Sequence, residues 1–339
     1  MNRKHFLASL AAASALLPPF KVLAKTVQTE NSSFKTPQYL KSGDNIGITS
    51  PAGFITVDEI QPAVLQMQSW GFNISVGSTI GKRDFTFGGT DEERIADLQE
   101  MLDNDNIKAI MCARGGYGLV RIIDRLDFSK FKKNPKWIIG FSDVTVLHCH
   151  LAKNYGIASI HSKMCNSFPS NWATAEPIQI ETILSIKNSL LGQQMTYNAP
   201  PNNNNRPGRT NGILVGGNLS IIETLSGSSS DLDTKGKLLF IEDTGEYLYS
   251  IDRMLWNLKR SGKLKNLAGL IIGGFKVKPD DEGEEFGKTV YEIVIEKIKE
   301  YDYPVAFDFP VGHQRNNFAL RCGLNHTLDV TNAGSVLTV

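Results

Sequence analysis

The sequence predicts an α/β fold in two domains, with a doubly wound parallel sheet in the N-terminal half and a mixed α/β domain with β-strands in the C-terminal half. In the first half, short apolar segments alternate with helical ones, which is typical of parallel sheets covered by helices. Glycine or small polar residues follow several apolar segments. In such sheets, sites form at these carboxyl ends of the strands.

The N-terminal half carries clear helix signals. Ile60, Val64 and Met67 recur at helical spacing, and Thr90 with Glu93 has the spacing of a capping box. This order predicts a flavodoxin-like domain over residues 37–167. We expect strands at 46–50, 73–76, 107–112, 137–139 and 157–160, and helices at 57–70, 92–102, 119–126 and 144–155.

A breaker-rich segment divides the chain. Periodicity weakens from residue 168, and Pro200-Pro201 and Pro207-Gly208 flank a run of asparagines, so we interpret 168–210 as the linker between domains. The C-terminal domain would then span 211–339. We expect strands at 237–241, 270–272 and 305–307, helices at 249–261 and 289–301, and a terminal hairpin of 327–330 with 335–339.

The N-terminus has the features of a secretory signal peptide. Basic residues precede an apolar stretch over 6–17, and Val22-Leu23-Ala24 supplies small residues at a cleavage position. Residues 1–24 are therefore expected to direct export, so that the protein would act outside the cytoplasm, in the periplasm.

Composition narrows the classes of partner. The chain is 41% hydrophobic and 21% charged with a formal net charge of +1, and it has no basic stripe. This balance argues against nucleic acid or an anionic membrane as the main partner. No apolar stretch approaches the roughly 18 residues that a stable membrane span needs. Four scattered cysteines suggest buried thiols rather than a disulfide or metal site.

The stretch Lys136–His148 has the pattern of a nucleophile elbow. An apolar strand runs into a turn that carries Ser142, and a helix follows. The helix N-terminus would offer backbone N–H groups to a developing oxyanion. The usual G-x-S-x-G pattern is not met, because Asp143 and Val144 follow the serine. Taken locally, a Ser-Asp helix N-cap is the simpler explanation.

Two residues of the second half favour the nucleophile elbow over the helix N-cap. Glu242 follows an apolar strand, and His313 follows another strand and a proline-containing turn. Each alone would be a surface polar residue. Together with Ser142 they supply a nucleophile, a base and an orienting acid. The Gly-rich Arg114–Gly118 loop, also at a strand end, would approach the substrate closely, and the N–H of Gly116 would complete an oxyanion hole beside that of Asp143.

Other assignments remain open from the residues alone. Cys149-His150 could suggest a thiol nucleophile, although neighbours on a helix point apart. Asp143, Asp243 and Glu246 are alternative acids, and His161 is a candidate for lining the site. The Arg114–Gly118 loop could cradle a phosphate, but it lacks the spacing of a nucleotide-binding loop.

Seven motifs in order give the chain a resemblance to a known family. It resembles the LD-carboxypeptidase family of serine peptidases, which includes murein tetrapeptide carboxypeptidases and microcin C self-immunity peptidases. The resemblance covers about residues 36–339. The motifs are Ala113–Gly118, Gly140–Thr145, Gly216–Leu219, Phe240–Asp243, Ile251–Leu255, Gly273–Phe275 and Pro310–His313.

The resemblance implies a Ser142–His313–Glu242 triad in a cleft between domains, no metal or cofactor, and in many members a homodimer. It implies an oxyanion hole from the backbone of two residues and cleavage of the L,D bond before the terminal D-alanine of a peptidoglycan tetrapeptide. The oxyanion-hole residues would be Gly116 and Asp143, and the residues near the substrate would be Arg114, Gly115, Tyr117 and His161.

One departure is visible after His161. The family commonly has Gly-Pro-Met there, whereas this chain has Ser162-Lys163-Met164. The shape of the substrate site near His161 is therefore expected to differ. Two alternatives to the carboxypeptidase remain: an immunity-type peptidase acting on aminoacyl-nucleotide analogues, and a noncatalytic muropeptide-binding protein.

Overall fold

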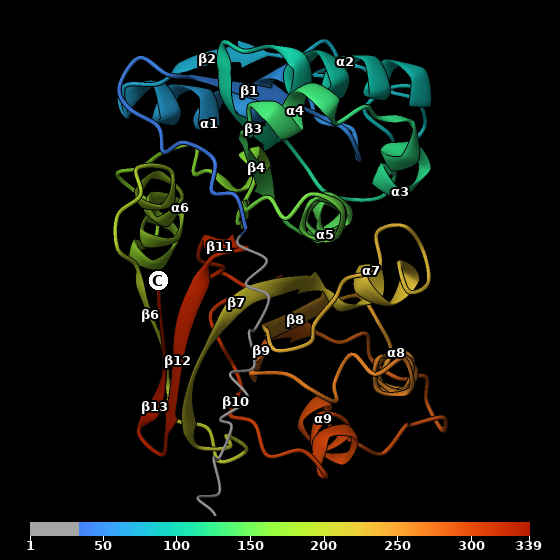
Figure 1. Ribbon diagram of the computed structural model, residues 1–339. Helices are drawn as coiled ribbons and strands as arrows, with labels where there is room; N and C mark the ends of the chain where they lie inside the picture. Colours follow the sequence, from blue (N-terminus) through green and yellow to red (C-terminus); the bar gives the residue numbers. More distant parts are fainter. Residues whose placement is uncertain (1–33) are drawn as a thin grey trace, which may run out of the picture. The chain divides into compact units, whose positions relative to one another are not determined.

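The computed structural model describes residues 34–339, so the expected signal peptide lies outside the described residues. The N-terminal sheet has five parallel strands in the order β2-β1-β3-β4-β5, the flavodoxin-like order, with β11 added antiparallel at one edge (Figure 1). The strands are β1 Asn45–Thr49, β2 Asn73–Val76, β3 Ile107–Cys112, β4 Trp137–Gly140, β5 Ser159–His161 and β11 Leu320–Cys322.

Helices cover both faces of this sheet. α1 and α6 pack in one apolar cluster, and α2 and α5 pack in another on the opposite face. Capping boxes start α1 at Thr56 and α2 at Thr90, as the Thr90–Glu93 spacing predicts. The helices are α1 Val57–Ser69, α2 Asp91–Asp103, α3 Leu119–Ile122, α4 Ser129–Lys133, α5 Thr145–Asn154 and α6 Pro177–Leu190.

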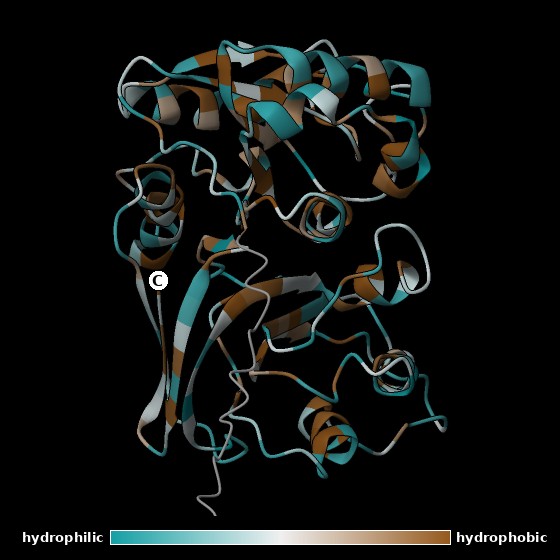
Figure 2. Cartoon of the chain, in the orientation of Figure 1, coloured by the Kyte–Doolittle hydropathy of each residue, from teal (hydrophilic) through white to brown (hydrophobic). Residues whose placement is uncertain are grey.

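The second sheet is mixed, as predicted. Its order is β10-β9-β8-β7-β12-β13-β6, with β10 to β7 parallel and the last three strands antiparallel. Figure 2 colours much of β8 as hydrophobic, and its residues 238–241 are fully buried between β7 and β9. Its elements are β6 Thr196–Ala199, β7 Gly208–Asn218, β8 Leu238–Thr244, β9 Gly269–Lys276, β10 Val305–Ala306, β12 Asn325–Thr331, β13 Gly334–Thr338, α7 Leu219–Thr224, α8 Leu248–Arg260 and α9 Val290–Ile298.

The segment 168–210 is more ordered than the linker that we expected. It contains the helix α6, which has Pro177 at its first position, and the strand β6, which pairs with β13. Proline at the start of a helix leaves no hydrogen bond unmade, so this residue begins the helix rather than breaking it. The C-terminal part of the chain also returns to the first sheet, where β11 pairs with β5 through Leu320 and His161.

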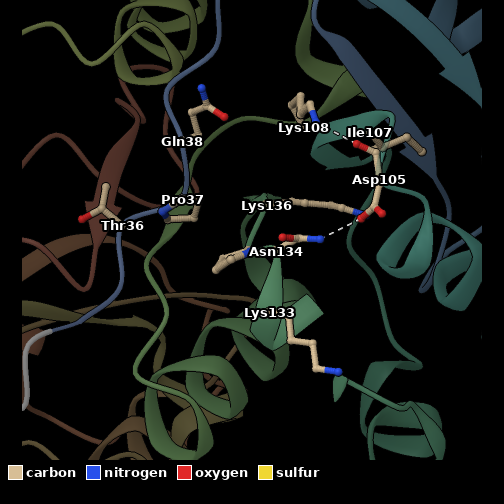
Figure 3. Close-up of a pocket in the computed structure, with 10 residues that line it drawn as sticks. Thr36, Pro37, Gln38, Asp105, Ile107, Lys108, Lys133, Asn134 and Lys136 are labelled. Atoms are coloured by element: carbon tan, nitrogen blue, oxygen red, sulfur yellow. Dashed lines mark hydrogen bonds between the residues drawn. The ribbon is translucent and has the colours of Figure 1, made fainter. Parts of the chain in front are cut away.

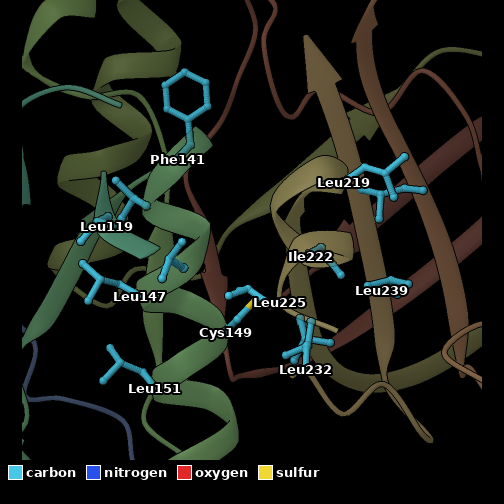
Figure 4. Close-up of a cluster of buried hydrophobic side chains, with 14 of the residues drawn as sticks. Leu119, Phe141, Leu147, Cys149, Leu151, Leu219, Ile222, Leu225, Leu232 and Leu239 are labelled. Atoms are coloured by element: carbon cyan, nitrogen blue, oxygen red, sulfur yellow. The ribbon is translucent and has the colours of Figure 1, made fainter. Parts of the chain in front are cut away.

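One apolar cluster is shared by elements from both halves. It contains Leu147 and Leu151 of α5 together with Ile222 of α7 and Leu239 of β8. Figure 4 shows Cys149 of α5 and Leu225, which follows α7, among the side chains of this cluster. Continuous packing of this kind fixes α5, and therefore the turn that precedes it, against the second sheet.

Two further properties of the described chain bear on the expectations above. All four cysteines are buried with free thiols. No helix within residues 34–339 is long and apolar enough to cross a membrane.

Candidate functional site

The turn after β4 has the conformation of a nucleophile elbow. Ser142 has a φ of +61°, a strained value for a non-glycine residue, and it begins a 3₁₀ turn that runs into α5. Gly140 makes the sharp turn possible, because a Cβ there would lie 2.8 Å from the side chain of Val144. Ser142 is half-buried, and its hydroxyl makes no hydrogen bond to any residue of the described chain.

The Gly-rich loop after β3 lies directly against this serine. A Cβ on Gly115 would lie 3.2 Å from the Ser142 hydroxyl oxygen, so a larger residue there would crowd the serine. Gly116 has a φ of +110° and is exposed beside it. The buried Arg94 guanidinium holds the loop in place by donating to the carbonyl oxygens of Pro51 (2.6 Å) and Gly118 (3.0 Å).

The side chain of Asp143 joins the elbow to the loop. Its carboxylate accepts a hydrogen bond of 2.9 Å from the backbone N–H of Leu119, the first residue of α3. Burial raises the pKa of Asp143 to about 6 despite this bond and the nearby Arg94 charge. From the sequence, Asp143 was expected to supply a backbone N–H to the oxyanion or to be an alternative acid, and this side-chain contact was not predicted.

Glu242 and His313 form a hydrogen-bonded pair. The Glu242 carboxylate is fully buried and accepts from His313 Nδ1 at 2.6 Å and from the His313 backbone N–H at 3.1 Å. Since a carboxylate only accepts, Nδ1 carries the proton and Nε2 is left as an acceptor. The register of β8 against β9 shifts around Glu242, and irregularities of this kind re-aim side chains near sites.

The structure brings this pair to the elbow. The ring of His313 lies 4.8 Å, centroid to centroid, from the ring of Phe141, which precedes Ser142. The antiparallel β11, seven residues along the chain from His313, anchors this part of the chain on the first sheet. Ser142, His313, Glu242 and the Gly115–Gly116 backbone thus gather at strand ends of two sheets. Such a group can perform nucleophilic acyl transfer with a stabilised oxyanion.

Arg114 and Tyr117 are exposed on the Gly-rich loop, where a bound molecule could reach them. Arg114 donates to the carbonyl oxygen of Phe54 at 3.2 Å, and the Tyr117 ring lies 5.8 Å from that of Phe87. Both expected residues therefore remain at the surface beside the elbow.

His161 differs from its expected position at the surface of the site. Its side chain is fully buried, with its ring 5.8 Å from that of Phe141 and 4.9 Å from that of Phe240. β11 covers the end of β5, which the sequence did not predict. Burial, reinforced by the neighbouring histidines and Lys163, places the pKa of His161 well below its usual value, so the ring is neutral.

A neighbouring histidine braces the elbow. His148 on α5 donates from Nε2 to the carbonyl oxygen of Gly140 at 2.9 Å and accepts at Nδ1 from the Ser159 hydroxyl at 2.8 Å. Burial lowers the pKa of His148 to about 4. A neutral imidazole therefore fixes the last residue of β4 before the turn.

The thiol alternative does not fit the geometry. Cys149 is buried, and burial raises the pKa of its thiol, which disfavours the reactive thiolate. His150 is occupied elsewhere through Nδ1, which lies 2.8 Å from the Ser230 hydroxyl oxygen. No group of three or more His, Cys, Asp or Glu side chains suited to a metal ion occurs between residues 34 and 339.

Asp243, like Asp143, accepts a hydrogen bond from a backbone N–H at the start of a helix. Its carboxylate accepts from the Ser220 backbone N–H at 2.8 Å and from the Asn218 side chain at 2.9 Å, so it holds the start of α7. Burial raises the pKa of Asp243 to about 6. The Asn218 backbone N–H donates to the Thr145 hydroxyl on α5 at 3.0 Å. These contacts make Asp243 a bridge between elements rather than the partner of His313.

A separate pocket lies at the other end of the strands of the first sheet, near the amino ends of β3 and β4 (Figure 3). Its Lys136 ammonium donates to three carbonyl oxygens at the end of α2, those of Met101, Leu102 and Asn104, at 2.6–2.8 Å. This lysine therefore closes a helix C-terminus and has no donor left for a ligand.

Comparison with known proteins gives consistent matches. Models of the LD-carboxypeptidase N-terminal and C-terminal domains match residues 46–162 and 211–328. A Bacillus subtilis protein named "Probable murein peptide carboxypeptidase" is 32% identical over 303 residues, 89% of this chain and 93% of its own length. The microcin C7 self-immunity protein MccF of Escherichia coli is 26% identical over 88% of this chain and 94% of its own.

A solved structure agrees with these matches. The crystal structure of muramoyltetrapeptide carboxypeptidase from Oxalobacter formigenes superposes with a TM-score of 0.76 and 26% sequence identity. The alignment covers 87% of this chain and 98% of that one.

Proposed function

Since this chain belongs to the LD-carboxypeptidase family and is a serine-type carboxypeptidase, we propose that it removes the terminal D-alanine from peptidoglycan tetrapeptides. The bond cleaved would be the L,D bond before that residue. Names of relatives that mention murein peptides support the substrate class. Murein turnover would be the process that this reaction serves.

In the proposed mechanism, Ser142 attacks the carbonyl carbon that precedes D-alanine. His313 Nε2 takes the hydroxyl proton and then gives it to the leaving amine. Glu242 holds the imidazole in the tautomer with Nδ1 protonated and stabilises the imidazolium that forms. The observation that carries this proposal is the 2.6 Å bond between Glu242 and His313 Nδ1, which leaves Nε2 to act as the base.

The oxyanion of the tetrahedral intermediate would be bound by the backbone N–H groups of Gly116 and Asp143. The close approach of Gly115 to the Ser142 hydroxyl, the positive φ of Gly116 directly after it, and the elbow at Ser142 support this arrangement. Losing one such donor costs on the order of a hundredfold or more in rate. Arg114 and Tyr117 would contact the substrate at the mouth of the site.

The direct test is mass spectrometry of a muropeptide digest before and after incubation with the protein. The wild type should convert tetrapeptides to tripeptides and release D-alanine, whereas Ser142→Ala should release none. Ser69→Ala, on α1, is the matched control and should keep full activity. Full activity in Ser142→Ala would refute the proposal.

A second candidate activity follows from the similarity to the self-immunity protein MccF, which covers 88% of this chain. In that case the same serine would hydrolyse an aminoacyl-nucleotide analogue. Incubation with aspartyl sulfamoyl adenosine separates the two activities, because only this one releases aspartate. Binding of a tetrapeptide without any product would instead indicate a noncatalytic muropeptide-binding protein.

We also propose that the protein is exported and meets its substrate outside the cytoplasm, on the basis of the pattern in residues 1–24. Fractionation of expressing cells, with N-terminal sequencing of the mature chain, tests this. A mature protein that begins near residue 25 in the periplasmic fraction is expected. An uncleaved chain in the cytoplasm would contradict it.

A further inference from the structure

A pocket of about 440 Å³ opens beside the candidate site. The charged side chains that line it are Lys163, Glu176 and Arg315. Two of them belong to segments that carry site residues, because Lys163 follows β5 and Arg315 lies two residues after His313. The pocket is therefore formed partly by the same segments that position the proposed base.

The location of Lys163 relative to Ser142 follows from the sheet. Gly140 at the end of β4 pairs with His161 at the end of β5, so Ser142 and Lys163 each lie two residues beyond a paired position. β5 adjoins β4 on the side away from β3, which carries the Gly-rich loop. Lys163 and the proposed oxyanion donor Gly116 thus lie on opposite sides of the serine.

Contacts of the Lys163 ammonium place it close to the proposed base. Nζ donates to the carbonyl oxygen of Gln314 at 2.7 Å and lies 5.7 Å from the centroid of the Phe141 ring. Gln314 follows His313 directly, and Phe141 precedes Ser142. The charge is therefore held between the two segments that carry the nucleophile and the base.

Lys163 is a cation without a carboxylate partner among residues 34–339. Glu176 is paired with Arg315 through two contacts of 2.6 and 2.7 Å, so these two charges compensate each other. Lys163 makes one hydrogen bond, to Gln314, although an ammonium group has three donors. Its side chain is half-buried, and burial lowers its pKa while the Glu242 charge opposes that shift. A half-buried cation with unused donors is suited to an anionic group of a ligand.

We propose that this pocket receives the leaving amino acid and that Lys163 binds its free carboxylate. The inference rests on the proposed function. In acyl transfer the base returns its proton to the leaving amine, so the leaving group must lie on the His313 side of the serine, away from the oxyanion donors. The Lys163 pocket is on that side. A peptide that continued past this residue would place a neutral amide against the ammonium, so Lys163 restricts cleavage to the chain end.

The test compares two substrates in two proteins. The substrates are a stem tetrapeptide with a free C-terminal D-alanine and the same peptide ending in D-alanine amide. Wild type should cleave the free acid with a kcat/KM about 10- to 100-fold higher, the range expected for a hydrogen bond to a charged group. Lys163→Met keeps the length of the side chain without its charge and should lose this preference, mainly through a higher KM for the acid. Lys163→Arg should restore part of it.

Lys130→Met, on the exposed face of α4, is the matched control and should keep the wild-type preference. If Lys163→Met prefers the acid as strongly as wild type does, Lys163 does not bind the carboxylate. An equal loss on both substrates would also overturn the inference, since it would assign the lysine a structural role. If wild type releases product from neither peptide, the proposed function itself fails and the inference falls with it.

Discussion

Gly312 lies against the side chain of Glu242 with no space between them for a Cβ atom. A methyl group at Gly312 would overlap Cβ, Cγ and Oε2 of Glu242, and the φ of Gly312 is +103°, which disfavours any other residue. Gly273, on the neighbouring strand β9, also approaches this side chain, because a Cβ there would lie 3.2 Å from Cβ of Glu242. Two glycines thus set the position of the carboxylate that His313 contacts.

We therefore expect Gly312→Ala to reduce kcat by roughly a hundredfold, since displacement of a catalytic group by about 1 Å has effects of that size. Release of D-alanine from a tetrapeptide measures it. Gly262→Ala is the control, because Gly262 also has a positive φ, +80°, but a Cβ there meets no atom within 4 Å. It should lose some stability and little activity. Similar activity losses in the two variants would show that strain, and not Glu242, is responsible.

Replacement of the acid tests the pairing directly. Glu242→Gln should lower kcat by about 10³- to 10⁴-fold, because a glutamine does not hold the imidazole in the required tautomer. Glu246→Gln is the matched variant four residues away. The side chain of Glu246 makes no hydrogen bond to the described residues, and only its carbonyl oxygen is used, by Lys278 N–H at 2.9 Å. Steady-state kinetics of both should leave Glu246→Gln near wild type. The reverse result would transfer the acid role to Glu246.

Asp143 should give stability an unusual pH dependence. Its pKa is raised from 3.8 to about 6 in the fold, so between these values the native state binds more protons than the unfolded state does. Stability from this group is therefore present at low pH and lost as pH rises to 6. The Asp143→Asn variant carries an amide there, which does not ionise. The free energy of unfolding of wild type minus that of Asp143→Asn should fall by about 2 kcal/mol between pH 4 and pH 7. Urea unfolding measures it, and a constant difference would contradict the buried, ionisable state.

His148 should give the opposite pH dependence of stability to that of Asp143. Its pKa is lowered from 6.5 to about 4, so the unfolded state binds more protons between those values, and stability falls as pH falls through that window. His148→Gln removes this titration together with the brace on Gly140. The wild type should be the more stable protein at pH 8, and its advantage should shrink by about 3 kcal/mol by pH 4. Urea unfolding at each pH gives the difference, and an advantage that grows with acid would refute it.

Local patterns were enough to predict the parallel sheet and the capping of its helices. The strands at 73–76 and 107–112 have the predicted bounds, and the Thr90–Glu93 capping box is formed as expected. These features depend on residues a few positions apart, so local sequence patterns are sufficient to predict them. The mixed sheet and the terminal hairpin were also predicted, and β12 pairs with β13 as expected.

Several contacts between residues far apart in the chain were not predicted. β11 is three residues long, too short for a periodic signal, and it forms only because β5 offers an edge. For the same reason His161 seemed accessible, although β11 buries it. The helix-capping roles of Asp143 and Asp243 also need partners that lie about 25 residues away. The available signal was an aspartate directly after Ser142 and another directly after Glu242, and both side chains were interpreted only as alternative acids.

The return of β11 to the first sheet has a consequence for how the protein is made. The ribosome produces the chain from its N-terminus, so the elbow with Ser142 is synthesised long before Leu320–Cys322. Until that strand docks beside β5, the segment carrying His313 lacks its strand pairing with the sheet that carries Ser142. A nascent or truncated chain would thus contain Ser142 without a positioned His313. Hydrolytic activity would begin only after the last strands have formed. If the enzyme is exported as we propose, this order keeps the chain inert during synthesis.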